Sequence, residues 1–199
     1  SFIIGDKFEK TFFEFGATDG LDISNSYLLE NSFNWKGVLA EPSPQWHDIL
    51  KMNRKSSKII TDCIWKETGK KLDFFMSDIG EYSTINDFIE NEIKSIPGNT
   101  RARKKGGSLI SVETISLNDV VKKYFKDSCP SYMSIDTEGS EYEILKAFDL
   151  NKYRPKLFTI EHNFTENERK IDEHLIINGY VRIFRKLTTF DAWYIPLEN

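Results

Sequence analysis

The sequence predicts one α/β domain built around a largely parallel sheet. Short apolar runs alternate with segments of helical periodicity along the chain, which is typical of βα units and parallel strands. The 199 residues fit a single domain, and 39% of them are hydrophobic, enough for a sizeable core. We therefore expect residues 1–199 to form one domain. Because the chain does not begin with Met, we also expect an N-terminal part of the protein to be missing from it.

Strand and helix signals alternate through the first half of the chain. Ser24 or Asn25 is expected to cap a helix that follows the first strand. Pro44 can occupy the first turn of the next helix, whose apolar face would include Ile49 and Leu50. The predicted strands of this half are residues 11–15, 36–40, 58–61 and 72–75.

The second half begins with an interruption of this pattern. Residues 77–108 are polar, contain Pro97-Gly98 and end in a basic run, so we expect a partly helical, mobile insertion or lid. The basic run is either a solvated loop or a contact for an anionic substrate. Ser116 and Thr165 are then expected to cap two helices. Strands are predicted over 110–114, 132–135 and 157–160, followed by an antiparallel hairpin over 180–184 and 193–195.

Composition excludes several classes of protein. The net charge of −4 is unlike that of a nucleic-acid-binding domain, which is usually basic. No apolar run approaches the ~18–20 residues of a transmembrane segment. The two cysteines, Cys63 and Cys129, form neither a disulfide framework nor a metal-binding spacing. This favours a reducing compartment, and we expect a cytoplasmic protein.

A glycine-containing turn follows the first predicted strand. In the stretch Glu14–Gly20, Gly16 and Gly20 let the backbone approach a ligand closely, and the amides of the next helix can hold an anion such as a carboxylate. The middle glycine of a dinucleotide-binding fingerprint is replaced by Thr18. The stretch therefore indicates a ligand loop that does not hold a dinucleotide, or else an ordinary strand-to-helix turn.

Acidic residues end the next two strands. Glu41 lies 21 residues after Gly20, close to the spacing at which a strand-end acid accepts hydrogen bonds from ribose hydroxyls. Asp62 ends the third strand and could bind the amino group of an adenine ring. The alternatives are a surface Glu at a strand end and a turn-forming Asp.

Two later strand ends carry candidate catalytic side chains. Asp136 follows the strand over 132–135, and Glu161 and His162 follow the strand over 157–160. One crossover helix would join these strands as parallel neighbours, so we expect both groups on one rim of a pocket at their carboxyl ends. His162 can accept a proton near neutral pH, and the carboxylates could orient it or share a divalent ion. Alternatively, His162 bonds only the backbone, and Glu138 and Glu141 only favour a helix N-terminus.

Taken together, these residues resemble the FkbM family of methyltransferases. No single stretch carries the resemblance, which extends in order over nearly the whole chain. Its carriers are Phe13–Gly20, Asn25–Glu30, Trp35–Pro42, Glu113–Asp119, Ser134–Glu141 and Glu161–Asn163. The replacement of the middle glycine by Thr18 departs from the general methyltransferase pattern, although FkbM-like members tolerate it.

The resemblance implies a fold, a cofactor and a reaction. The fold is the class I methyltransferase (Rossmann-like) three-layer sandwich, with a mostly parallel seven-stranded sheet and a C-terminal antiparallel hairpin. The cofactor is S-adenosyl-L-methionine, and the reaction is O-methylation of a sugar, glycan or related small molecule. The residues expected to contact the cofactor are Glu14, Gly16, Ala17, Asp19, Gly20, Asn25, Ser26, Glu41, Pro42, Asp62, Cys63 and Asp136.

Other functions compete with this reading. A catalytically silent glycan-binding or scaffold module would keep the same fold, because fold alone does not prove activity. A dinucleotide oxidoreductase lacks its glycine fingerprint here. A metal-dependent hydrolase could use Asp136, Glu138 and His162. A sugar hydroxyl is a weak nucleophile and needs a base or a metal, and the sequence does not decide which.

Overall fold

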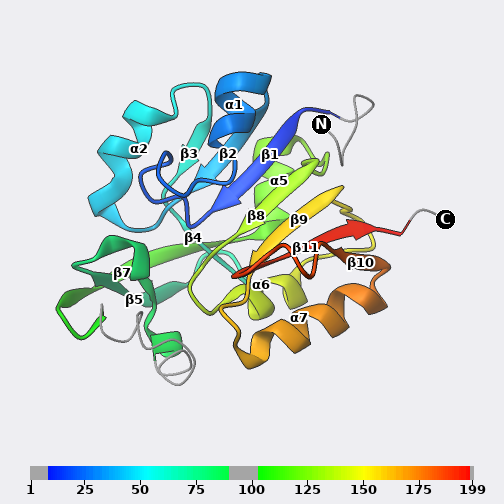
Figure 1. Ribbon diagram of the computed structural model, residues 1–199. Helices are drawn as coiled ribbons and strands as arrows, with labels where there is room; N and C mark the ends of the chain where they lie inside the picture. The colour runs from blue at the N-terminus through cyan, green and yellow to red at the C-terminus, as the bar shows by residue number, and fades with distance from the viewer. Residues whose placement is uncertain (1–8, 90–102, 198–199) are drawn as a thin grey trace.

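The computed structural model describes residues 9–89 and 103–197. Its main sheet has the strand order β10-β11-β9-β8-β1-β2-β3 (Figure 1). The five strands β9, β8, β1, β2 and β3 run parallel to one another, and β11 runs antiparallel to both β9 and β10. The predicted seven-stranded sheet with a closing hairpin is therefore confirmed. Its strands are β1 (Thr11–Phe15), β2 (Lys36–Ala40), β3 (Lys58–Ile60), β8 (Tyr132–Ile135), β9 (Leu157–Glu161), β10 (Tyr180–Ile183) and β11 (Asp191–Pro196).

Helices cover both faces of this sheet. Alternation along β1 sends Phe13 and Phe15 into the larger core cluster and Phe12 into a second cluster on the opposite face. The larger cluster includes buried side chains of α5, α6 and α7, and the second includes Leu50 of α2. The helices are α1 (Tyr27–Phe33), α2 (His47–Asn53), α5 (Leu117–Phe125), α6 (Glu141–Ala147) and α7 (Glu166–Ile177), and the 3-10 turn η1 (Pro44–Trp46) leads into α2.

The sequence predicts two helix caps correctly, but its prediction that Ile49 lies on a buried apolar face is wrong. Ser116 accepts a hydrogen bond from the Asp119 amide and caps α5, and Thr165 caps α7 through the Asn167 amide. Ile49 was expected on the apolar face of α2 beside Leu50, but it is 43% exposed. The α2 helix has only seven residues, and Leu50 is its one buried side chain.

A second, four-stranded sheet stands beside the first, with the order β4-β7-β5-β6. It consists of β4 (Cys63–Trp65), β5 (Lys71–Ser77), β6 (Thr84–Ile85) and β7 (Gly107–Ser116), with the 3-10 turns η2 (Gly80–Tyr82) and η3 (Asn86–Phe88). Both ends of the predicted insertion 77–108 belong to this sheet, because Ser77 pairs with Gly107 and Met76 with Ser108. Residues 90–102, where the insertion was expected to be partly helical and mobile, lie outside the described residues.

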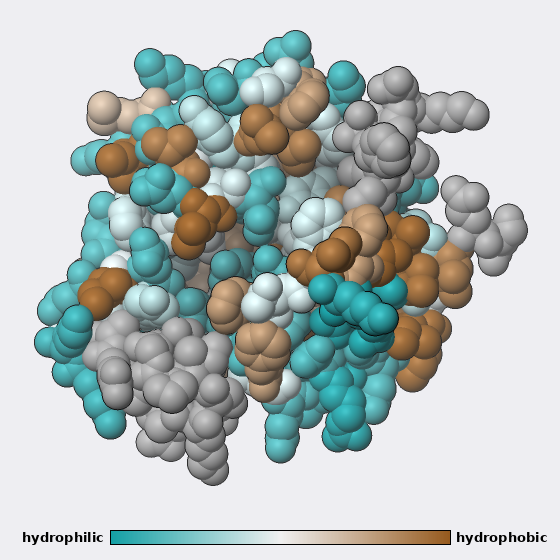
Figure 2. All heavy atoms as spheres, viewed as in Figure 1, coloured by the Kyte–Doolittle hydropathy of each residue, from teal (hydrophilic) through white to brown (hydrophobic). Residues whose placement is uncertain are grey.

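The surface is mixed in character. On the face shown in Figure 2, hydrophobic side chains form separate groups among hydrophilic ones. Within residues 9–89 and 103–197, no helix is long and apolar enough to cross a membrane.

Candidate active site

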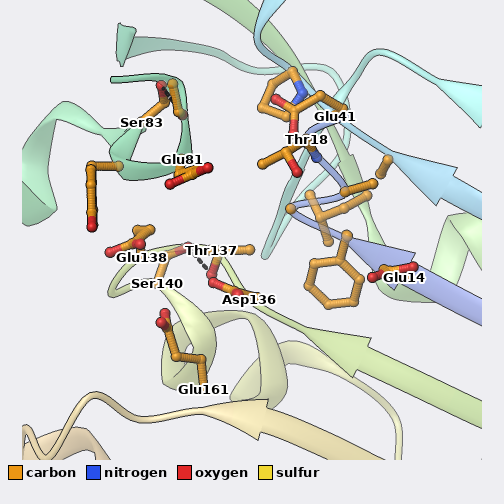
Figure 3. A pocket seen from close by; sticks show the side chains of 18 of the residues that line it. Glu14, Thr18, Glu41, Glu81, Ser83, Asp136, Thr137, Glu138, Ser140 and Glu161 are labelled. Carbon is orange, nitrogen blue, oxygen red and sulfur yellow. Dashed lines mark hydrogen bonds between the residues drawn. The ribbon is translucent and has the colours of Figure 1, made fainter. Parts of the chain in front are cut away.

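A cavity of about 470 Å³ opens where the carboxyl ends of β1, β2, β8 and β9 meet the second sheet. Ligands of open α/β sheets bind at this edge. One wall comes from the loops after β1 and β2, and another from the loops after β8 and β9. The third wall comes from the second sheet and η2, which contribute Phe74, Ile85 and residues 80–83. Figure 3 labels Glu81 and Ser83 on this wall.

The turn after β1 needs glycine at its first position. Gly16 has a φ of +79°, and a Cβ atom there would lie 1.7 Å from the carbonyl oxygen of Asp136. The turn therefore packs directly on the backbone of the next strand end, which no side chain would allow. Thr18, at the position of the missing middle glycine, still adopts a left-handed φ of +46°. Its amide donates to Glu41 Oε2 at 2.9 Å, so the loop keeps a glycine-like path without glycine.

Glu14, near the end of β1, organises the segment before α1. Its carboxylate accepts hydrogen bonds from the Ser24 hydroxyl and the Asn25 amide, each at 2.9 Å, and from the Ser26 hydroxyl. Because these three residues are engaged with Glu14, α1 begins only at Tyr27. The helix start therefore differs from the predicted cap at Ser24 or Asn25.

Arg54 is a buried hub that sequence reasoning missed. Only 1% of this residue is exposed, and its guanidinium lies 2.8 Å from Glu30 and 3.6 Å from Glu14. It also donates to the carbonyl oxygen of Gly20 and to the hydroxyls of Ser24 and Ser26. The loop between β1 and α1 is thus fastened to the end of α2. A lone Arg after a short helix gives no sequence signal for such a role.

Glu41, which follows β2, is buried with both carboxylate oxygens bonded. Oε2 accepts from the Thr18 amide and Oε1 from the Ser43 amide at 2.8 Å. Burial raises the pKa of this carboxyl to about 7, against the lowering effect of the two amides. Cys63 lines the same part of the cavity, and burial raises the pKa of its thiol to about 12, which keeps the thiol protonated.

An acidic cluster lies across the cavity from Glu41. Asp136, Glu138 and Glu161 each offer a carboxylate oxygen, and these oxygens lie within 4.8 Å of one another. Burial raises the pKa of Asp136 to about 7, and a hydrogen bond with Glu161 partly offsets that rise. Burial and the Asp136 charge raise the pKa of Glu161 well above its ordinary value. Near neutral pH this pair can therefore take up or release a proton.

Arg103 neutralises one member of this cluster. Its guanidinium donates to Glu138 Oε2 at 3.1 Å and to the carbonyl oxygen of Tyr82 at 2.8 Å. Only 6% of Arg103 is exposed. This residue of the basic run is thus neither in a solvated loop nor a lining residue of the cavity. It joins the turn η2 to the loop after β8.

His162 is buried but does not line the cavity. Its Nδ1 accepts from the Phe164 amide at 3.1 Å, and its Nε2 lies 3.3 Å from Nη2 of Arg182. Burial lowers the pKa of the imidazole. Asp136 and His162 follow neighbouring parallel strands, as expected, but only Asp136 and Glu161 point their side chains into the cavity.

The structure separates the residues expected to contact the cofactor into two groups. Those that line the cavity are Glu14, Gly16, Ala17, Asn25, Glu41, Pro42, Cys63 and Asp136. The other four, Asp19, Gly20, Ser26 and Asp62, do not line it. Asp19 accepts from the amides of Leu21 and Asp22, and Ser26 lies in the buried network of Glu14. Glu81, Tyr82 and Ser83 also line the cavity, and they belong to the predicted insertion or lid over 77–108.

Comparison with known proteins shows which family the chain belongs to. The methyltransferase FkbM domain matches residues 14–190, from Glu14 of the glycine turn to the end of the hairpin loop. The chain belongs to the FkbM methyltransferase family. No curated protein matches this FkbM methyltransferase in sequence.

Solved structures show the same fold at low identity. The human methyltransferase 10 domain containing protein has a TM-score of 0.53 and 11% identity, over 100% of this chain and 78% of that one. Precorrin-6y C5,15-methyltransferase from Geobacter metallireducens GS-15 has a TM-score of 0.50 and 11% identity, over 94% and 80%. This FkbM methyltransferase therefore has the class I fold, and family and fold together make it an S-adenosylmethionine-dependent methyltransferase.

Proposed function

We propose that this FkbM methyltransferase methylates a hydroxyl group of a sugar, glycan or related small molecule, with Asp136 as the base. The observation that carries the proposal is the position of Asp136. Its carbonyl oxygen packs on Gly16 of the glycine turn, and it lines the same cavity as η2 on the opposite wall. A base is needed between the two ligands of such a reaction, because a hydroxyl is a weak nucleophile.

The residues on the sheet side fit S-adenosylmethionine. Gly16 lines the cavity, and its lack of a Cβ atom lets the turn pack against the Asp136 carbonyl oxygen beside the ligand space. Asn25 and the backbone of the turn would hold the methionine part, Glu41 the ribose, and the region of Cys63 the adenine. When bound there, the cofactor supplies an electrophilic methyl group on its sulfonium.

The acceptor would lie between Asp136 and the second sheet. Positioning its oxygen in line with the methyl group supplies much of the rate. Asp136 would take the hydroxyl proton, since its pKa of about 7 lets it be ionised near neutral pH. Glu161, which shares a hydrogen bond with Asp136, would orient that carboxylate.

Two variants of this mechanism remain, one in which a metal ion assists Asp136 and one in which His162 replaces it as the base. The carboxylates of Asp136, Glu138 and Glu161 are oxygen ligands of the kind that Mg²⁺ prefers, and their spacing fits one ion. In the other variant His162 takes the proton. The geometry favours Asp136 over His162, because both ring nitrogens of His162 have neighbours outside the cavity.

The test combines cofactor titration with a methylation assay on a panel of sugars and glycosides, read by mass spectrometry. Asp136→Asn should lower turnover by ~10²–10⁴-fold and leave S-adenosylhomocysteine affinity within a few-fold. Asp73→Asn, on the exposed face of β5, is the matched control and should change neither. If His162→Ala loses as much turnover as Asp136→Asn, the base assignment moves to His162.

Two further measurements separate the remaining possibilities. Activity that survives exhaustive chelation excludes the metal variant. Cofactor and sugar binding without any product would instead indicate a catalytically silent binding module.

A further inference from the structure

The described lining of the cavity is strongly acidic. It contains six carboxylates and no Lys, Arg or His side chain within residues 9–89 and 103–197. These carboxylates are Glu14, Glu41, Glu81, Asp136, Glu138 and Glu161.

Three of the six already have strong partners in the protein. Glu14 is bonded by the segment before α1 and paired with Arg54, and Glu41 is bonded by two backbone amides. Glu138 is paired with Arg103. Negative charge facing the acceptor region therefore comes from Glu81 and from the Asp136–Glu161 pair, which is only partly ionised near neutral pH because burial raises both pKa values.

These three groups come from different elements and face one space. Glu81 lies on η2, Asp136 follows β8, and Glu161 ends β9 (Figure 3). Glu81 is exposed, and no hydrogen bond to its side chain occurs in the described part of the chain. Only 9% of Glu161 is exposed, and its Oε2 atom has no hydrogen-bond partner among the described residues. A buried carboxylate oxygen without a donor is costly unless a ligand supplies one.

We propose that the acceptor carries a protonated amine beside the hydroxyl that receives the methyl group, as an amino sugar does. This rests on the proposed function and names its substrate class. The ammonium would donate to Glu161 Oε2 and face Glu81, because an ammonium has three N–H donors and no acceptor. An acceptor with a carboxylate or phosphate at this place would be repelled, since like charges set against each other exclude a ligand.

The arrangement fits an ammonium better than a metal ion. One oxygen of Glu138 is already bonded to the Arg103 guanidinium, which occupies part of the potential metal-ligand set. Glu81 lies outside the group of three close carboxylates and extends the negative wall toward the acceptor. In the transfer itself the ammonium is a bystander. The acceptor oxygen gains its bond to the methyl carbon as the cofactor's carbon–sulfur bond breaks, and the hydroxyl proton goes to Asp136.

The proposal is tested by binding, with three probes of one ring shape. Methyl α-glucosaminide, methyl α-glucoside and methyl α-glucuronide are positive, neutral and negative near neutral pH. Each is titrated into protein saturated with S-adenosylhomocysteine, by saturation-transfer NMR. We expect the glucosaminide to bind at least tenfold more tightly than the glucuronide, with the glucoside between them.

Variants assign the preference to the acidic wall. Glu81→Gln and Glu161→Gln should each reduce the advantage of the glucosaminide over the glucoside several-fold, with little change in glucoside affinity. Glu113→Gln, on the exposed face of β7, is the control and should leave the order intact. Equal or tighter binding of the glucuronide overturns the proposal, and so does a preference that neither variant reduces.

The same titrations are repeated with a chelator and with added Mg²⁺. A glucosaminide preference that Mg²⁺ abolishes would make the metal the cation of this site and would overturn the proposal. Failure of the proposed function has a different signature. In that case S-adenosylhomocysteine binds, the charge preference is measured, and no hydroxyl is methylated.

Discussion

Arg54→Ala removes the cation that fastens the loop after β1 to the end of α2. In the native protein its guanidinium makes hydrogen bonds of 2.8 to 3.1 Å to Glu30, the Gly20 carbonyl and two serine hydroxyls, and it faces Glu14 at 3.6 Å. The variant leaves the two carboxylates buried without their counter-charge. Removing one partner of a buried ion pair typically costs about 3–5 kcal/mol, a large share of a usual domain stability of about 5–15 kcal/mol.

Chemical denaturation, followed by circular dichroism, measures this loss. Lys55→Ala is the matched control, because it removes the same charge from the next residue, which is exposed. Its effect should stay within about 0.5 kcal/mol, as for most surface substitutions. Arg54→Lys keeps the charge but loses the planar fork, so it should fall between the two. An Arg54→Ala loss below about 1 kcal/mol would refute the assignment of Arg54 as the hub.

Three further predictions concern the cavity. Gly16→Ala should abolish cofactor binding or folding, because its Cβ atom would meet the Asp136 carbonyl oxygen. Gly69→Ala is the control: Gly69 has the same φ of +79°, but its Cβ atom would meet nothing within 4 Å, so the variant should cost only about 1–3 kcal/mol of backbone strain. Thermal-shift measurements with S-adenosylhomocysteine compare the two variants. Glu41→Ala should weaken cofactor binding by about 1–3 kcal/mol in calorimetry, and unchanged affinity would remove Glu41 from the site. Because a base must be ionised, kcat/KM should rise with pH through about 7, the raised pKa of Asp136, and level off above it. A profile flat from pH 5 to 8 would count against Asp136.

Local sequence signals were sufficient for the main sheet. The strands Thr11–Phe15 and Lys36–Ala40 have the predicted bounds, because the glycine or the Glu-Pro pair that follows each apolar run marks where the strand ends. The strands predicted over 72–75 and 110–114 also exist. Their pairing with each other in a second sheet was not predicted, since partner and register of distant strands depend on tertiary packing.

The candidate site was predictable in position but not in orientation. Strand-end placement locates Asp136, Glu161 and His162 at one edge, and the structure puts the carboxylates in the cavity and the imidazole outside it. A sequence does not reveal which way such a side chain turns. Arg54 and Arg103 look like ordinary surface cations in sequence, and only the folded chain brings buried carboxylates to them.

The second sheet shares no strand with the first. The turn at Gly16, the Glu41 strand end and the Asp136 strand end belong to the first sheet, while η2, Phe74 and Ile85 belong to the second. Residues 71–85 and 107–112 therefore form no ladder with β1, β2 or β8, and they meet the first sheet through side-chain packing of Phe74, Ile85 and Val112. If the acceptor lies against the second sheet, as proposed, replacing this wall with that of a homologue should change which compound is methylated while cofactor binding at the first sheet stays the same.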